Sequence, residues 1–193
     1  MIIVGSGCGP GMLTEEAIKA IQKASLIYGS KRAIELCRNY ISKTSDVREI
    51  TDYKNLHTLP DDAVVLSTGD PMLAGLGYLK GKIIPGISSM QYAFAKLKIP
   101  LTKAVVVNSH GKDHDAAVQK TLCEIERGYI VFLIAEPGFE TADLCRALNS
   151  SDSDIKITVC ENLGYSDERI ITSFVSSPPE KKSSLFALIA GRY

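Results

Sequence analysis

The sequence predicts an α/β protein of two domains, the first built on a mainly parallel sheet and the second on a mixed sheet. In the first half, short apolar runs alternate with helical patterns, which is typical of parallel strands joined by crossover helices. In the second half, three strand-like runs follow one another with little helix between them, which favours antiparallel pairing. We expect domains at residues 1–101 and 102–193, because Pro100 interrupts a helix and the element types change after it.

The elements of the first half follow in a regular order. Thr14 precedes an acidic first turn, which is the pattern of a helix start. The expected strands are MIIVG (1–5), SLIYG (25–29), DVREI (46–50), AVVLSTGD (63–70) and KIIPG (82–86). The helical patterns between and after them are TEEAIKAIQKA (14–24), KRAIELCRNY (31–40), MLAGLGYLKG (72–81) and SSMQYAFAKLKI (88–99).

The second half begins with the same alternation and then departs from it. Its first four elements are a strand AVVVNSHG (104–111), a helix DHDAAVQKTLCEIE (113–126), a strand YIVFLIAEPG (129–138) and a helix ETADLCRALNS (140–150). Three strands close it: DIKITVCENLG (154–164), ERIITSFVSS (168–177) and SSLFALIAG (183–191). A mixed sheet accommodates this order.

Charge and cysteine content limit the classes of partner. Lys plus Arg and Asp plus Glu both number 22, so no global field draws the chain to nucleic acid or an anionic membrane. The five cysteines form no CxxC pair, and we expect buried free thiols in a reducing cytoplasm and no metal site. There is no basic leader with an apolar core and no apolar run near about 18 residues, so we expect neither a signal peptide nor a membrane span.

The stretch VGSGCGPG (4–11) stands where a dinucleotide-binding loop would stand, between a strand and a helix. A dinucleotide fingerprint requires GxGxxG and an acidic residue about 20 positions on, at the end of the second strand. Reading from Gly5 places Pro10 at the third glycine, and reading from Gly7 places Met12 there. The second strand is followed by basic residues, so the acid is missing too. The loop is therefore a tight turn or a ligand loop of another kind.

Two more small-residue loops follow predicted strands. One contains Gly69, Asp70 and Pro71, and the other contains Pro85-Gly86 followed by Ser88 and Ser89. Each is explained singly as a helix cap. Three such loops at successive strand ends would leave backbone groups open around one ligand-binding edge of the sheet.

The order VGSGCGPGMLT, STGDPMLAGLG, IIPGISSMQYAFAKL resembles the tetrapyrrole methylases, the S-adenosylmethionine-dependent family of corrin and sirohaem synthesis. Similar stretches continue along the chain: GSKR (29–32), NSHGKD (108–113), AEPGFETADLCRAL (135–148) and ENLGYSDERI (161–170). The last of these resembles the branch that methylates carbon 5 of the corrin precursor. The resemblance implies two α/β domains with S-adenosylmethionine bound in the cleft between them.

The resemblance also implies which residues line the cofactor, largely through backbone atoms. They are Cys8, where relatives often have proline or leucine, then Gly69, Asp70, Pro71, Leu73, Ser88, Ser89, Ile134 and Leu163. Methyl transfer to carbon needs in-line positioning and no metal or covalent nucleophile. A base is needed only to remove a proton afterwards, and the candidates are His110, Glu161 and Tyr165.

Corrin precursors carry several carboxylates, so a neutral protein needs cations beside them. The candidates for substrate binding are Lys31, Arg32, His110, Lys112 and Arg169, and each is otherwise an ordinary surface charge or structural residue. The family implies a homodimer. Because 193 residues leave no room for a module that methylates carbon 15 and decarboxylates, we expect a separate enzyme for that step.

Other functions fit the same pattern less well. A family member acting on another ring position, on a protein or on RNA would share these loops, although an RNA enzyme needs a basic face. A regulatory module that binds a nucleotide on a doubly wound sheet without catalysis is the alternative from a different class.

Overall fold

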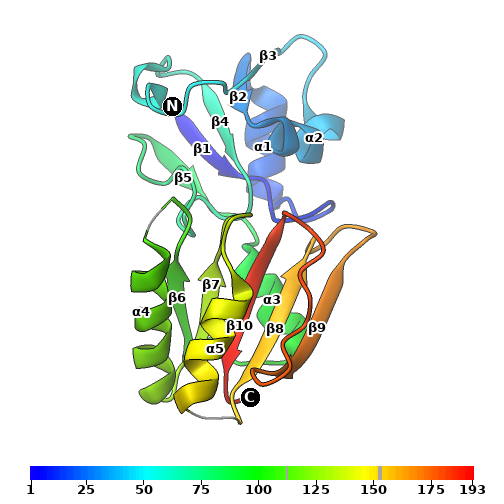
Figure 1. Ribbon diagram of the computed structural model, residues 1–193. Helices are drawn as coiled ribbons and strands as arrows, with labels where there is room; N and C mark the ends of the chain where they lie inside the picture. The colour runs from blue at the N-terminus through cyan, green and yellow to red at the C-terminus, as the bar shows by residue number, and fades with distance from the viewer. Residues whose placement is uncertain (112, 152–153) are drawn as a thin grey trace. The chain divides into compact units, whose positions relative to one another are not determined.

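The computed structural model describes residues 1–111, 113–151 and 154–193 (Figure 1). The chain divides into two compact units, Met1–Tyr92 and Ala93–Tyr193. The division falls inside helix α3 (Ser89–Leu97), ahead of the boundary expected after residue 101. Pro100 lies three residues after the end of α3 and directly precedes the short 3-10 turn η3 (Leu101–Lys103).

The first unit is built on a five-stranded, wholly parallel sheet in the order β3-β2-β4-β1-β5. Its strands are β1 (Ile2–Gly5), β2 (Leu26–Gly29), β3 (Asp46–Glu49), β4 (Val64–Ser67) and β5 (Lys82–Ile84). Its helices are α1 (Glu15–Lys23) and α2 (Lys31–Cys37), with the 3-10 turns η1 (Arg38–Tyr40) and η2 (Leu56–Thr58). The parallel sheet expected for the first half is confirmed.

The two faces of this sheet are covered differently. Val4 and Leu66 lie in one buried cluster with Ala17, Ile21 and Ala33 of the helices. Their strand neighbours face the other way and pack with apolar side chains from the loops, the buried members being Ile3, Ile50, Leu56, Val65 and Leu79. Helix α1 begins where expected, since the Thr14 hydroxyl accepts the Ala17 N–H.

The helix expected over residues 72–81 is not formed, and a series of turns takes its place. Ala74 adopts φ 64°, a left-handed conformation that a helix excludes. A Cβ at Gly75 would lie 2.6 Å from the Ser67 Oγ, so the chain folds back onto the end of β4. The apolar spacing of this stretch instead places Leu79 in the second cluster of the sheet.

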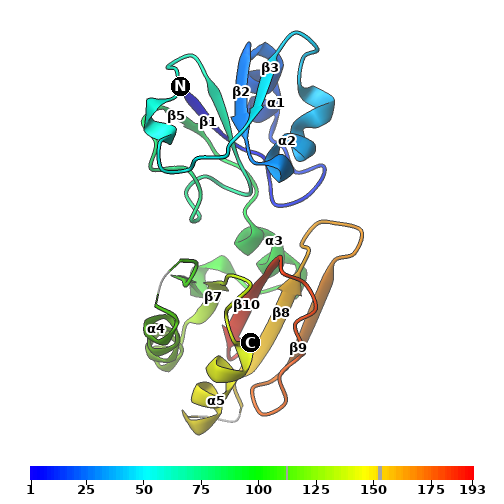
Figure 2. The same cartoon turned by 45° about the horizontal axis from the view of Figure 1, so that its top comes forward.

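The second unit contains a five-stranded mixed sheet in the order β6-β7-β10-β8-β9 (Figures 1 and 2). Its strands are β6 (Ala104–Asn108), β7 (Ile130–Ile134), β8 (Lys156–Glu161), β9 (Arg169–Phe174) and β10 (Phe186–Gly191). Strands β6 and β7 are parallel, and the remaining pairs are antiparallel. Helices α4 (His114–Glu126) and α5 (Thr141–Ser151) connect the first strands. The mixed sheet expected for the second half is confirmed.

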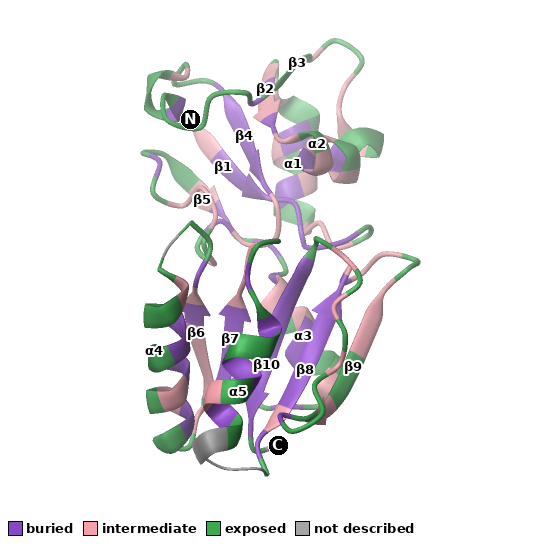
Figure 3. Ribbon diagram, viewed as in Figure 1, coloured by how far each residue is buried: buried purple, intermediate pink, exposed green. Residues whose placement is uncertain are grey.

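Helices α4 and α5 cover one face of the second sheet, as Figure 1 shows. Val131 and Leu133 of β7 point into a large cluster with Leu144 and Leu148 of α5. Phe132 points to the opposite face, where its ring meets that of Phe94 of α3 at 6.4 Å between centroids. All six residues of β10 are buried, as the colouring of Figure 3 makes visible.

Four of the five cysteines are buried free thiols, as expected, whereas Cys123 is exposed. Burial raises the pKa of Cys160 to about 12, so its thiol stays protonated at neutral pH. Within the described ranges, no helix combines the length and the apolar character needed to cross a membrane.

Candidate functional site

Three loops meet at the carboxyl edge of the first sheet. Strand β1 lies between β4 and β5, and all three are parallel, so the loops that follow them reach the same edge. The Gly7 N–H donates to the Gly69 carbonyl at 3.2 Å, and the Gly69 N–H donates to the Gly7 carbonyl at 2.8 Å. The structure therefore brings the opening loop and the Gly69 loop into direct contact.

Asp70 ties the second loop to the third. Its Oδ2 accepts the Gly86 N–H at 2.9 Å, and its Oδ1 accepts the Met72 N–H at 2.8 Å. The carboxylate thus stabilises both its own turn and the Pro85-Gly86 turn. Pro71 is buried beside it, and the half-buried Leu73 donates its N–H to the Asp70 carbonyl at 3.1 Å.

Glycine is required where these loops cross. A Cβ on Gly86 would lie 2.3 Å from the Gly69 carbonyl oxygen, and a Cβ on Gly5 would lie 2.5 Å from the Gly86 nitrogen. Both contacts are with backbone, which cannot swing aside as a side chain can. The backbones of the three loops are therefore packed directly against one another.

Ser88 serves as the start of helix α3. Its hydroxyl accepts the Gln91 N–H at 3.1 Å, and its own N–H and hydroxyl donate to the Gln91 Oε1. This is the reciprocal arrangement of a capping box. Ser89 is the first residue of the helix and is half-buried. The cap explanation of this pair therefore holds, and Ser88 is 3% exposed.

The remaining predicted residues of the first unit are Cys8, Lys31 and Arg32. Cys8 is 8% exposed, and its thiol donates to the Met12 Sδ at 3.4 Å. Lys31 is exposed and Arg32 is half-buried in the first turn of α2, at the carboxyl end of β2. The Ser30 hydroxyl caps this helix by accepting the Ala33 N–H at 3.2 Å.

In the second unit, the loops after β6 and β7 lie side by side because the two strands are parallel and in register at Asn108 and Ile134. The Ile134 carbonyl accepts both the N–H and the hydroxyl of Ser109, each at 2.9 Å. Both lone pairs of this carbonyl are therefore used, and the adjoining loop is fixed to the end of β7.

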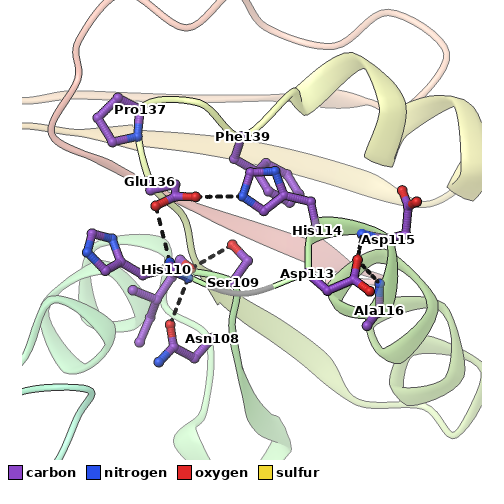
Figure 4. Close-up of polar contacts among 12 residues, drawn as sticks. Asn108, Ser109, His110, Asp113, His114, Asp115, Ala116, Glu136, Pro137 and Phe139 are labelled. Carbon is purple, nitrogen blue, oxygen red and sulfur yellow. Dashed lines mark hydrogen bonds and ion pairs between the residues drawn. The ribbon is translucent and has the colours of Figure 1, made fainter.

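Glu136 joins these two loops through its side chain (Figure 4). Its Oε2 accepts the Gly111 N–H at 3.1 Å, and its Oε1 lies 2.8 Å from the His114 Nε2. The hydrogen bond with His114, then that from Gly111 and the nearby charge of His110, lower the pKa of the Glu136 carboxyl below its usual value. Because the carboxylate is ionised, the His114 ring donates the proton of this bond.

The exposed His110 lies two residues after the end of β6, and its N–H donates to the Asn108 Oδ1 at 3.0 Å. Figure 4 shows the His110 and His114 rings on opposite sides of the Glu136 carboxylate. Lys112, predicted to bind substrate, lies outside the described residues.

Glu161 and Arg169 face each other across the β8–β9 hairpin. Arg169 Nη1 lies 2.6 Å from Glu161 Oε2 and also donates to the Glu180 carbonyl at 2.9 Å. The other oxygen, Glu161 Oε1, accepts the N–H groups of Lys182 and Ser183. Burial alone raises the pKa of the Glu161 carboxyl, but the bonds from Arg169, Ser183 and Lys182 outweigh it and hold that pKa below its usual value.

Leu163 and Tyr165 lie in the turn that joins these strands. Leu163 is 6% exposed. The Tyr165 N–H donates to the Asn162 carbonyl at 3.0 Å, and the Tyr165 hydroxyl oxygen is shielded from solvent. Among the residues that the structure describes, no group of three or more His, Cys, Asp or Glu side chains is arranged to hold a metal ion.

Residues 1–178 match the family model described as tetrapyrrole (corrin/porphyrin) methylases. The chain belongs to the tetrapyrrole methylase family. A relative named probable cobalt-precorrin-7 C(5)-methyltransferase, from Methanocaldococcus jannaschii, is 34% identical over 190 residues, which cover 85% of this chain and 85% of that protein. A Sinorhizobium protein named precorrin-6Y C(5,15)-methyltransferase [decarboxylating] is 27% identical over 91% of this chain, which spans only 45% of that relative.

A solved structure of similar fold is that of a protein named cobalamin biosynthesis precorrin-6Y methylase, from Archaeoglobus fulgidus. It is 29% identical, with a TM-score of 0.77 over 100% of this chain and 98% of that one. The resemblance to tetrapyrrole methylases and the fold class predicted from the sequence are both confirmed.

For this tetrapyrrole methylase, sequence reasoning did not identify Glu136, His114 and Ser109 as part of a polar cluster. Glu136 stands in AEPG, two residues after the end of β7, and Asp70 stands in GDP, three residues after the end of β4. That parallel was the available signal, because an acidic residue at the end of a parallel strand lies at the ligand-binding edge. The second available signal for this polar cluster was the closeness of His110 and His114 in the sequence.

Proposed function

We propose that this chain transfers the methyl group of S-adenosylmethionine to carbon 5 of a corrin precursor, cobalt-precorrin-7 or precorrin-6Y. The observation that carries the proposal is the 34% identity to the Methanocaldococcus relative over 85% of both chains. The stretch ENLGYSDERI, which begins at Glu161, supports the same branch of the family.

The loop edge of the first unit fits S-adenosylmethionine. Gly5 and Gly86 lie so close to neighbouring backbone that no side chain fits there, so the three loops pack main chain against main chain, and we propose that a ligand at this edge binds main-chain donors and acceptors. Such groups suit the carboxylate, hydroxyl and purine nitrogen atoms of the cofactor. When bound, S-adenosylmethionine supplies a methyl group on a positively charged sulfur.

We assign cofactor binding to the residues predicted from the family resemblance: Cys8, Gly69, Asp70, Pro71, Leu73, Ser88, Ser89, Ile134 and Leu163. Asp70 acts by holding two loops together, since both of its oxygens are bound to backbone N–H groups. Ser88 supports the site indirectly by capping the start of α3, because its hydroxyl is bound to Gln91. Ile134 contacts the cofactor through atoms other than its carbonyl oxygen, because that oxygen already accepts the Ser109 hydroxyl.

The carboxylates of the tetrapyrrole need cations, and Lys31 and Arg32 are the first choice in the first unit. Both lie in the first turn of α2, where no acidic side chain balances them. In the second unit, His110 and Arg169 are the described candidates, with Lys112 beside His110 in the sequence. Arg169 already shares its charge with Glu161, so it contributes less to substrate binding than Arg32.

Catalysis by this chain then consists of orientation and charge placement. Fixing two reactants in line is worth about 7–11 kcal/mol of the barrier. The tied loops after β1, β4 and β5 supply such rigidity, because each is bonded to a neighbour.

Three further properties belong to the proposal. The enzyme works in the cytoplasm, which agrees with its five free cysteines. It forms a homodimer by analogy with its family. We assign methylation of carbon 15 and decarboxylation to a separate partner enzyme, in line with the similarity to a relative named for carbon 5 alone.

Calorimetry and product analysis test the proposal. S-adenosylhomocysteine is expected to bind in the micromolar range, and NAD and ATP are expected not to bind. Incubation with cobalt-precorrin-7 and methyl-labelled S-adenosylmethionine should place one label on carbon 5, read by carbon NMR of the product. A label on another ring carbon, or transfer to a protein substrate such as that of diphthine synthase, would reassign the chain within its family. Binding of NAD or ATP alone would refute a methyltransferase.

A further inference from the structure

The structure distinguishes among the three side chains that the sequence offers as a base. Glu161 is 1% exposed, and its two oxygens are occupied by Arg169, Lys182 and Ser183. Taking up a proton would break bonds that hold the loop before β10. The Tyr165 hydroxyl oxygen is buried from solvent. His110 alone of the three is an exposed side chain at the carboxyl edge of parallel strands, where ligands bind in α/β sheets.

Charge balance requires that a proton leave in the reaction, and this step rests on the proposed function. The bond between the methyl carbon and the sulfonium breaks, and its electron pair stays on sulfur, which becomes a neutral thioether. The new carbon–carbon bond takes its electron pair from the macrocycle, so the methylated product carries one additional positive charge. Loss of one proton removes that charge.

We propose that His110 accepts this proton and that Glu136 positions His110 to do so. The imidazole nitrogen binds the proton with its lone pair, and the electron pair of the carbon–hydrogen bond that breaks returns to the macrocycle. Glu136 acts through the loop: its carboxylate binds the N–H of Gly111, the residue next to His110. It therefore sets the backbone that carries the His110 ring.

The rest of the cluster keeps Glu136 itself in place. His114 donates to its other oxygen, and the His114 ring packs edge-on against Phe139 at 5.2 Å between centroids. Phe139 is 1% exposed, so this ring is a fixed support. Lys181 donates to the carbonyls of Pro137 and Phe139, which anchors the loop after β7 from the other side.

The charged and titratable groups at the cluster come from four segments. The loop after β6 contributes His110 and Asp113, and the latter caps α4 by accepting the Asp115 N–H at 2.9 Å. Helix α4 contributes His114, the loop after β7 contributes Glu136, and the segment before β10 contributes Lys181. Glu136 is thus the carboxylate that lies between the two histidines (Figure 4).

Substitution of His110 tests the proton transfer. His110→Gln keeps a polar side chain of similar size but loses the basic nitrogen, and we expect kcat to fall about 100-fold. The KM value for S-adenosylmethionine should stay within about twofold, since removal of an interaction made only in the transition state lowers kcat. Added imidazole should restore turnover of His110→Ala, more strongly as rising pH converts it to its neutral form. His57→Gln, in the exposed turn η2, is the matched control and should keep wild-type kcat.

Glu136→Ala tests the positioning role. It removes the acceptor of the Gly111 N–H, so kcat should fall about tenfold while S-adenosylhomocysteine affinity, measured by calorimetry, is unchanged. Glu136→Gln keeps a carbonyl acceptor for Gly111 and should recover most of the lost kcat. In His110→Gln the Glu136→Ala change should have no further effect on kcat, because Glu136 acts through His110.

Distinct results overturn distinct claims. Wild-type kcat in His110→Gln, or a raised tetrapyrrole KM with unchanged kcat, would exclude His110 as proton acceptor. Equal losses from Glu136→Ala in the presence and absence of His110 would exclude the positioning role. A wild-type enzyme that transfers no methyl group to the corrin precursor would instead overturn the proposed function, and the inference with it.

Discussion

Glu161 and Arg169 form an ion pair at the paired ends of β8 and β9, with 2.6 Å between Glu161 Oε2 and Arg169 Nη1. The glutamate side chain is 2% exposed and the arginine side chain 27%. This pair links the hairpin to the segment before β10, because Glu161 Oε1 holds Lys182 and Ser183. The ion pair therefore contributes mainly to the stability of the second unit.

Arg169→Met should destabilise the protein by about 3 kcal/mol, because it leaves a buried carboxylate without its countercharge. Urea denaturation at neutral pH measures the loss. The matched control is Arg146→Met, whose partner Asp143 is exposed, and this change should cost less than about 1 kcal/mol. Equal losses in the two variants would show that the Glu161 pair is no stronger than a surface pair.

The same carboxyl predicts a pH dependence of stability. Its pKa is lowered in the folded state, so the stabilisation is complete above the unfolded value of about 4.3 and disappears as pH falls through the folded value. The free energy of unfolding should therefore fall more steeply below about pH 4.5 in wild type than in Glu161→Gln. Denaturation curves collected between neutral and acid pH compare the two. Parallel slopes would contradict the lowered pKa.

Gly86→Ala should destabilise the first unit by about 2 kcal/mol or more, because its Cβ would lie 2.3 Å from the Gly69 carbonyl oxygen. It should also weaken S-adenosylhomocysteine binding, since the loops must separate. Gly138→Ala is the control: its Cβ meets nothing within 4 Å. Thermal unfolding and calorimetry report both effects, and a Gly86→Ala protein as stable as the control would refute the close crossing of these loops.

Asp70→Ala should weaken cofactor binding about tenfold, because the N–H groups of Gly86 and Met72 lose their shared acceptor and the two loops are released from each other. Asp70→Asn keeps one carbonyl acceptor and should lose less. Calorimetry with S-adenosylhomocysteine measures the series, with exposed Asp62→Asn as the control. If Asp70→Ala binds the ligand as wild type does, the tie between these loops does not shape the site.

Arg32→Glu should have opposite effects on stability and on substrate use. An acidic residue suits the first turn of α2 better than a cation, so the protein should gain about 0.3–1 kcal/mol of stability. The KM for the tetrapyrrole should rise several-fold, and the rise should shrink with added salt. Arg38→Ala, beyond the other end of α2 and paired with Glu35, is the control and should leave this KM unchanged. A KM of Arg32→Glu equal to that of wild type would remove Arg32 from the substrate site.

The strands and the three glycine loops could be predicted because their information is local. An apolar run followed by Gly69-Asp70 or Pro85-Gly86 identifies a strand end wherever the chain goes next. The prediction of a helix at residues 72–81 was wrong because it, too, used local information alone. The apolar spacing there resembled a helix, but Ala74 takes a left-handed conformation and Gly75 packs under Ser67.

The polar pairs depended on register, which the sequence did not reveal. Glu136 meets Gly111 and His114 because β6 and β7 are aligned at Asn108 and Ile134. Glu161 and Arg169 were each considered alone, one as a base and the other as a substrate ligand. Glu161 ends β8 and Arg169 begins β9, so the antiparallel hairpin places the two residues opposite each other.

The position of β10 in the second sheet has a consequence for synthesis of the chain. This strand is synthesised after the other four strands of its sheet, yet it lies between β7 and β8. Until residues 186–191 arrive, the β6–β7 pair and the β8–β9 hairpin are separate pieces with open apolar edges, which are sites of aggregation. The first unit, whose strands all lie before residue 85, can complete its sheet much earlier. A nascent chain of this protein would therefore have a folded amino-terminal unit while its second half still needs protection by chaperones.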